Sequence, residues 1–336
     1  MKHEYPDLNA LYLDTLRHLC TSFEHRNSPR GQDERENIGF SVRLTSPARR
    51  YCLVRQRRQN IIFNYAEALW YLSGKNDLDF IRNYAPSMER YSPDGVSLPG
   101  TGYGAKLLKD VGGEDAIERV VNILREDDPA SKRAVLQVFD DSEDIYRRNI
   151  DVSCTLALQL LLRGEHLHMV AFMRANDAYM GLLNDTFSFT FLQEFLASML
   201  GVTPGVYVHQ VGSLHIYEKD LTRVEELLEH SGQVIDAPRA LPQLPPGATM
   251  AQVREVLTLE QSIRADQLPA DALTALTLPH AWVEILRLFW IHRQLQSGRP
   301  IDVSVLDDLH PLHRDLLTNR WPAIESDHTH VTAVHR

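Results

Sequence analysis

The sequence predicts an α/β (α+β) protein with a helical C-terminal region. Two strand-like apolar runs flank Arg163-Gly164-Glu165, a pattern typical of a β-hairpin. Apolar residues recur at helical spacing both before and after this hairpin. A hydrophobic content of 43% and a charged content of 24% are ordinary for a globular protein, and 336 residues can bury a sizeable core.

Composition also argues against several kinds of partner. A net charge of −10 disfavours non-specific nucleic-acid binding, which needs a basic surface. No apolar run approaches ~18 residues, so we expect no membrane span. Three cysteines without a CxxC pair indicate a reducing, cytoplasmic setting. The terminal histidines His328, His330 and His335 have no cysteine near them, and we expect no metal site.

The first 140 residues alternate helices, strands and loops. Apolar periodicity predicts helices at 7–24, 60–73 and 114–125 and strands at 40–44 and 134–139. Cys20 continues the apolar pattern of the first helix and is expected to pack there. Arg30 lies between Pro29 and Gly31 in a polar segment that is predicted to be a loop. Glu67 lies in the second helix among aromatic residues, where burial would raise the pKa of its carboxyl group.

The hairpin places a cysteine beside an arginine. Antiparallel pairing about Gly164 brings residue 154 opposite residue 174. A neighbouring cation lowers the pKa of a thiol, so we expect Arg174 to favour the thiolate of Cys154.

A helix and a strand follow the hairpin. The helix is predicted over 186–200, where Asp185 or Asn184 could simply serve as its N-cap. The strand at 204–210 leads to His215 and Tyr217. These two residues are two positions apart, so on a strand their side chains would project from the same face. Residues 232–248 are Pro-rich connection, and helices are predicted at 249–264, 281–296 and 305–320. The predicted organisation is therefore a core of residues 1–231, the connection, and a helical region of residues 249–336 packed on the core.

These motifs resemble the catalytic centre of the thymidylate synthase family over roughly residues 28 to 222. The corresponding residues are Cys154, Arg174, Asp177, Gly181-Leu182 and Asp185, with the segments Glu67 to Gly74 and Gly212 to Asp220. The resemblance implies a thymidylate synthase-like fold, with a large mixed β-sheet flanked by helices. It also implies 5,10-methylenetetrahydrofolate as cofactor and a homodimer with a shared phosphate site.

The resemblance assigns roles to individual residues. Cys154 would be the nucleophile and Glu67 the proton relay, although the alternative for Glu67 is a helix-edge glutamate. Phosphate would be held by Arg30 and Arg174, with Lys132 and Arg133 reaching across from the partner, although Arg30, Lys132 and Arg133 could each be merely solvated. His215 and Tyr217 would hold the sugar, whereas a core histidine is the alternative. Asp177 and Gly181 would contact the folate.

Three residues depart from the family pattern: Ala175, Asn176 and Asp185 replace a serine, a cysteine and the base-reading asparagine. A carboxylate can accept a hydrogen bond from the amino group of cytosine. It cannot hydrogen-bond to O4 of uracil, because both groups are acceptors. Ala175 leaves space that could admit a ribose hydroxyl, although a neutral replacement is nearly as good an explanation. We therefore expect a CMP 5-hydroxymethylase, like the cytidylate hydroxymethylases of nucleoside-antibiotic pathways.

Other functions remain open on sequence alone. A dCMP hydroxymethylase and a thymidylate synthase proper use the same chemistry. A non-catalytic nucleotide- or folate-binding regulator is a different class, and the joint presence of Cys154, Glu67 and Asp177 argues against it.

Overall fold

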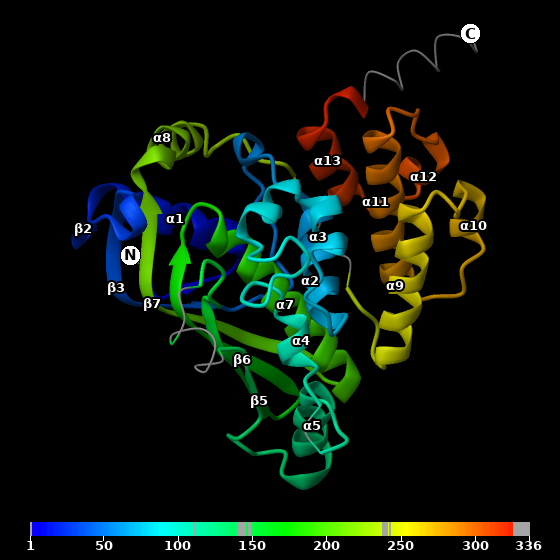
Figure 1. Cartoon of the computed structure of the whole chain (residues 1–336), viewed down its shortest axis with the longest axis horizontal. Helices are drawn as coiled ribbons and strands as arrows, with labels where there is room; N and C mark the ends of the chain where they lie inside the picture. Colours follow the sequence, from blue (N-terminus) through cyan, green and yellow to red (C-terminus); the bar gives the residue numbers. More distant parts are fainter. Residues whose placement is uncertain are drawn as a thin grey trace.

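A computed structural model describes residues 2–110, 112–139, 146, 149–236, 241 and 243–324. The described residues form one seven-stranded sheet in the order β1-β3-β7-β6-β5-β4, with β2 paired to β3. Figure 1 labels the strands β2, β3, β7, β6 and β5 of this sheet. The strands are β1 Glu4–Tyr5, β2 His25–Asn27, β3 Glu34–Leu44, β4 Val135–Gln137, β5 Thr155–Arg163, β6 His166–Asp177 and β7 Thr203–Tyr217. Parallel and antiparallel pairs both occur, which confirms the mixed sheet.

The central hairpin is confirmed. β5 and β6 pair antiparallel across a turn at Gly164, whose φ of 58° suits glycine. The backbone N–H of Arg174 donates to the carbonyl of Cys154 at 2.8 Å. These two residues are therefore opposite each other, as the turn position predicts.

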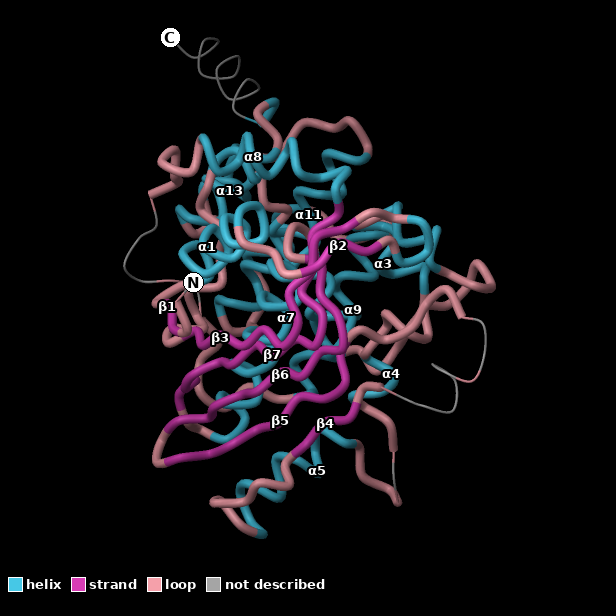
Figure 2. The backbone as a smooth tube through the Cα atoms, turned by 90° about the vertical axis from the view of Figure 1, so that its left-hand side faces the viewer, coloured by secondary structure: helices cyan, strands magenta, loops and turns pink. Residues whose placement is uncertain are grey.

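A parallel pair brings the ends of two strands together. β6 and β7 run parallel, and Asp177 pairs with His215. The crossover between them is α7, Gly181–Leu200, which ends at Gly201 with a φ of 71°. Fifteen residues of α7 are buried, so this helix forms the centre of the core against the sheet. In Figure 2, β3, β7, β6 and β5 run side by side with α1, α7, α11 and α13 above them.

Two capped helices complete the N-terminal part of the core. Asp7 accepts a hydrogen bond from the backbone of Ala10 at 2.8 Å and begins α1. Asn60 accepts from the backbone of Phe63 at 3.1 Å and begins α2, which packs against α7. The helices of this part are α1 Leu8–Thr21, α2 Ile61–Leu72, α3 Leu78–Tyr84, α4 Gly104–Leu107, α5 Ala116–Asn122 and α8 Leu221–Glu229. The helices α1 and α2 confirm those predicted at 7–24 and 60–73.

The C-terminal region is helical. Its helices are α9 Met250–Arg264, α10 Ala270–Thr274, α11 His280–Gln296, α12 Val303–Asp307 and α13 Pro311–Arg320. They form one group at the right of Figure 1, where α9, α11 and α13 contact α2. The single helix predicted at 305–320 is wrong: α12 ends before Pro311, which starts α13 because proline is tolerated in a first turn but not inside a helix.

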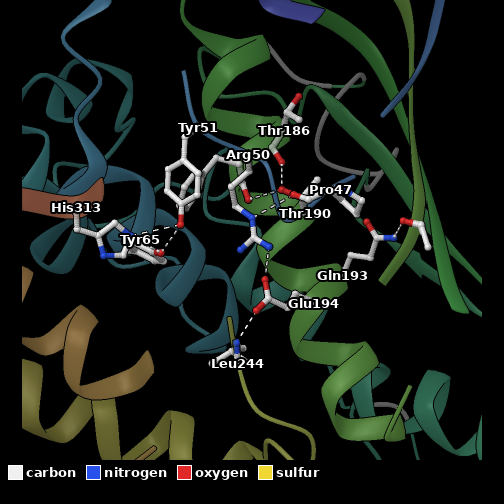
Figure 3. Close-up of polar contacts among 12 residues, drawn as sticks. Pro47, Arg50, Tyr51, Tyr65, Thr186, Thr190, Gln193, Glu194, Leu244 and His313 are labelled. Carbon is white, nitrogen blue, oxygen red and sulfur yellow. Dashed lines mark hydrogen bonds and ion pairs between the residues drawn. The ribbon is translucent and has the colours of Figure 1, made fainter. Parts of the chain in front are cut away.

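A buried polar joint connects this helical group to the core and is formed by Arg50, Tyr51, Tyr65, Glu194, Glu284 and His313. Figure 3 labels all of these residues except Glu284. The hydroxyls of Tyr51 and Tyr65 lie 3.3 and 3.1 Å from Nε2 of His313. Nδ1 of His313 lies 2.8 Å from Glu284 on α11. Arg50 pairs with Glu194 of α7, so these two buried charges are matched.

Several predicted boundaries need correction. β3 begins at Glu34 inside the segment predicted as loop, because its polar residues pair with the end of β7. β4 is limited to three residues, and β7 continues through His215 to Tyr217. No helix in the described ranges is long and apolar enough to span a membrane. His328, His330 and His335 lie outside the described residues.

Candidate active site

Cys154 and Arg174 lie where β5 begins and β6 nears its end. Nη2 of Arg174 is 3.7 Å from Sγ of Cys154. The same guanidinium group donates to the carbonyls of Ser153 at 2.9 Å and Val152 at 3.0 Å, which fixes its position beside the thiol. The hairpin thus brings together the cation and the cysteine that the sequence predicted.

The electrostatic prediction for Cys154 is wrong in its net direction. Burial raises the pKa of the thiol, and this exceeds the lowering effect of Arg174 and Arg30. The carboxyl group of Asp185 adds to the rise. The free protein therefore holds Cys154 mainly as a thiol. The guanidinium group of Arg174 lies beside it and can stabilise the negative charge when the thiolate forms.

Glu67 and Asp185 form a pair of neighbouring carboxyl groups on α2 and α7. Glu67 is only 6% exposed and accepts a hydrogen bond from Oγ of Ser188 at 2.7 Å. Burial and the nearby Asp185 raise the pKa of Glu67, as the sequence predicted from its apolar neighbours. Burial also raises the pKa of Asp185. At least one of the two carboxyls can hold a proton near neutrality.

Asp185 does not cap the helix. α7 begins at Gly181, so Asn184 and Asp185 both lie inside the helix. Asn184 accepts from the amide of Asn64 at 2.9 Å. The capping alternative is therefore wrong for both residues.

Asn176 contacts Asp185 directly. Its Nδ2 donates to Oδ2 of Asp185 at 2.6 Å, while its Oδ1 lies 3.1 Å from Nε2 of His209. Nδ1 of His209 lies 2.8 Å from the hydroxyl of Tyr207. The sequence marks Asn176 as a departure from the family pattern, but no motif marks His209 or Tyr207, which reach the site only through the pairing of β6 with β7.

Asp177, His215 and Tyr217 gather at the shared end of β6 and β7. The rings of His215 and Tyr217 have centroids 5.1 Å apart, and Oε2 of Glu34 lies 3.9 Å from Nε2 of His215. Asp177 accepts from the backbone N–H of Tyr179 at 2.9 Å. Burial raises the pKa of Asp177 to about 6. Glu34 was not predicted as a site residue, because strand β3 was expected to begin later.

The predicted phosphate cations divide into two groups. Arg30 adopts a left-handed φ of 56° in a turn and interacts electrostatically with Cys154 and Tyr217. Lys132 and Arg133 precede β4, whose register directs them toward the hairpin turn and away from Cys154. Arg133 pairs with Asp127 at 3.7 Å. One subunit therefore brings Arg30 and Arg174 to the thiol but leaves Lys132 and Arg133 elsewhere.

Two small residues border the site. Ala175 pairs with Ser213 across β6 and β7. A Cβ on Gly181 would lie 2.6 Å from Nδ2 of Asn176 and 3.3 Å from Oδ2 of Asp185. Only glycine at position 181 leaves room for this amide and carboxyl arrangement.

Comparison with known proteins follows this geometry. Residues 10–256 match the family described as thymidylate synthase. The deoxyuridylate hydroxymethyltransferase of Pseudomonas phage M6 is 30% identical over 185 residues, which is 54% of this chain and 52% of that protein. The protein of the same name from Bacillus phage SP01 is 30% identical over 221 residues, which is 62% of this chain and 57% of that protein. The chain thus spans a little over half the length of these curated relatives.

A solved structure has the same fold. Thermostable thymidylate synthase A from Bacillus subtilis superposes with a TM-score of 0.58 at 17% identity. The match covers 69% of this chain and 87% of that one. The sheet and its flanking helices are therefore those that the sequence resemblance implied.

Proposed function

Because this chain belongs to the thymidylate synthase family, we propose that it is a CMP 5-hydroxymethylase. It would transfer a one-carbon unit to C5 of the base and complete the reaction with water. The observation that carries this proposal is the position of Cys154 and Arg174 beside two buried carboxyl groups, one of which replaces the base-reading amide of the family.

Cys154 is the proposed nucleophile. Its Sγ would add to C6 of the pyrimidine, which makes C5 electron-rich and divides a difficult substitution into easier steps. Arg174 stabilises the thiolate and, with Arg30, would bind the phosphate. Glu67 has a pKa raised by burial, which suits it to hold and transfer a proton near neutral pH.

The chain has side chains that fit a folate. Asp177 is a carboxyl group held by the backbone N–H of Tyr179, and it can accept hydrogen bonds from a pterin ring. Gly181 leaves the amide of Asn176 and the carboxyl group of Asp185 in place, because a Cβ at position 181 would crowd both, and we propose that its backbone borders the folate. When bound, 5,10-methylenetetrahydrofolate supplies the one-carbon unit.

Asp185 is the proposed reader of the base. Asn176 occupies its Oδ2, and the carboxyl group can accept from the N4 amino group of cytosine. An ionised carboxylate opposite O4 of uracil would bury two facing acceptors, which costs ~1–3 kcal/mol. This chemistry favours cytosine.

A second candidate is deoxyuridylate, the substrate named for the phage relatives. The raised pKa of Asp185 supports it, because a neutral carboxyl group can donate to O4. The two candidates differ in pH dependence: use of a uracil substrate would fall as Asp185 ionises, whereas use of cytosine would not.

Ribose recognition is proposed at Ala175. The missing hydroxyl leaves room for a ribose 2′-hydroxyl near the phosphate and sugar. The test is the ratio of kcat/KM for CMP over dCMP, which should exceed one in the parent and fall in Ala175→Ser. An unchanged ratio would remove the argument for a ribonucleotide.

A homodimer would complete the phosphate site. Lys132 and Arg133 lie away from Cys154 in their own subunit, and Val135 and Leu156 on the neighbouring strands leave 42% and 36% of their surface exposed. These apolar side chains support a subunit contact at this part of the sheet.

The deciding experiment measures tritium release from [5-³H]CMP on addition of 5,10-methylenetetrahydrofolate, with dCMP and dUMP in parallel. We expect release with CMP and none in Cys154→Ala, which should still bind nucleotide. Mass spectrometry should find a hydroxymethylated base. A methylated product, release from dUMP alone, or turnover by Cys154→Ala would refute the proposal.

A further inference from the structure

Three buried side chains form a continuous chain of hydrogen bonds that ends on Asp185. The order is Tyr207, His209, Asn176 and Asp185, with separations of 2.8, 3.1 and 2.6 Å. Tyr207 and His209 are fully buried, and Asn176 is 3% exposed. Tyr207 and His209 are two residues apart on β7 and therefore share its core-facing side next to α7, whereas Asn176 lies near the end of the neighbouring strand β6.

The chemistry of each group fixes the direction of donation. Asn176 turns its N–H to a carboxylate oxygen, so its amide oxygen faces His209 and can only accept. Nε2 of His209 must then carry the hydrogen. Burial lowers the pKa of His209 to about 3, so the ring is neutral and Nδ1 has a lone pair for the hydroxyl of Tyr207. Every donor in the chain points toward Asp185.

This arrangement prevents the Asn176 amide from turning over. The reversed amide would place its NH₂ group against the N–H of His209 and its oxygen against Oδ2 of Asp185. Both contacts would then be unfavourable unless the imidazole changed tautomer and Asp185 gained a proton. The state of the imidazole and the state of the carboxyl group are therefore linked.

We propose that Tyr207 and His209 are positioning residues that hold Asn176 as a donor to Asp185, and that this donor makes the carboxyl group discriminate cytosine from uracil. The inference rests on the proposed function, because it concerns how Asp185 reads the base. A fixed donor on Oδ2 favours the ionised carboxylate, which accepts from the amino group of cytosine and repels O4 of uracil. Without the donor, the neutral carboxyl group becomes more common and can donate to O4.

The direction of the pH effect follows from the surroundings of Asp185. The hydrogen bond from Asn176 lowers the pKa of Asp185, against the rise caused by burial and by Asp177. The titratable groups that interact with it are Glu67, Tyr71, Tyr103, Cys154, Asp177 and Tyr207. Loss of the donor should therefore move the protonation of Asp185 to higher pH.

The test compares His209→Leu with His209→Gln. Leucine removes the donor to Asn176, whereas the glutamine amide can donate to Asn176 and accept from Tyr207. Dissociation constants for CMP and UMP would be measured by calorimetry from pH 6 to 9, without cofactor. We expect the preference for CMP over UMP at neutral pH to fall about tenfold in His209→Leu and to stay within about threefold of the parent in His209→Gln.

A spectroscopic measurement covers the case in which His209→Leu does not fold. Nitrogen-15 NMR of the parent, with the His209 signals identified from their absence in His209→Gln, should show the Nε2–H tautomer without titration between about pH 5 and 9. An Nδ1–H tautomer, an unchanged preference in folded His209→Leu, or equal losses in both variants would overturn the inference. A parent that binds UMP as tightly as CMP would instead refute the proposed base and leave the tautomer measurement valid.

Discussion

Replacing Asp185 with asparagine should reverse the proposed preference for cytosine over uracil. The structure predicts how the new amide would lie. Asn176 donates to position Oδ2, so the amide would turn its oxygen to Asn176 and its NH₂ group toward the base. That NH₂ group complements O4 of uracil and opposes the amino group of cytosine.

The size of the reversal follows from two exchanged contacts. In the Asp185→Asn variant, the amino group of cytosine loses its acceptor on the protein, and O4 of uracil gains a donor. Each buried polar group without a matching partner costs about 1–3 kcal/mol. The two changes together amount to about 2–6 kcal/mol, or roughly 30- to 10⁴-fold in the ratio of kcat/KM for CMP over UMP. Removing one of two neighbouring carboxyl groups also lowers the pKa of Glu67, so the pH profile should shift toward acid.

The assay is tritium release from both labelled nucleotides under first-order conditions. Asp185→Ala is the control, because it removes the acceptor without supplying a donor. It should lower kcat/KM for CMP without raising kcat/KM for UMP. If Asp185→Asn still prefers CMP, Asp185 does not read the base and the proposed substrate loses its main support.

Three further predictions test the phosphate site, the buried carboxyl group and the glycine. Mixing Arg174→Ala with Arg133→Ala subunits should restore about a quarter of the parental activity, since half of the dimers have one intact site of two; no recovery would contradict a shared site. Glu67→Gln should become more stable relative to the parent as pH rises from about 4.5 to about 8, by up to about 1.4 kcal/mol per pH unit. Burial raises the pKa of Glu67 to about 8, so the stability that its protonated form confers is full below about pH 4.5 and is lost as pH rises to that value. Urea unfolding at pH 5 and 8 measures this difference, and a constant difference would refute it. Gly181→Ala should lower kcat/KM about tenfold or more by displacing Asn176. The helix propensity of alanine, about 1 kcal/mol better than that of glycine, offsets part of the lost hydrogen bonding, so the variant should still fold. Unchanged kinetics would show that the position of the amide does not matter.

Local patterns predicted the parts of the fold that depend on neighbouring residues. The helices α1 and α2 follow from apolar periodicity, and the hairpin follows from its turn. β1 and β2 were not predicted, because strands of two and three residues are defined by the partner β3 rather than by their own composition. Two helices replaced one near Pro311, where the proline outweighed the apolar pattern.

The candidate site divides in the same way. Cys154 beside Arg174 follows from counting residues around a turn, whereas the direction of the pKa shift of Cys154 depends on burial by distant elements. His209 contacts Asn176 only because β7 returns parallel to β6 after the α7 crossover. Such a contact is set by topology, and no spacing within either segment encodes it.

The buried polar joint has a consequence for protein synthesis. Tyr65 belongs to α2, the helix that carries Glu67, yet its partner His313 is 248 residues later in the chain. At ribosomal rates of about 5–20 residues per second, that separation takes roughly 12–50 s to traverse. During this interval the tyrosine hydroxyl has no such partner, and the apolar face of α2 that later meets α11 and α13 is uncovered. The nascent chain therefore depends on α11 and α13 to cover the helix that bears the proposed proton relay, and a chain truncated before α11 would leave this face of α2 exposed.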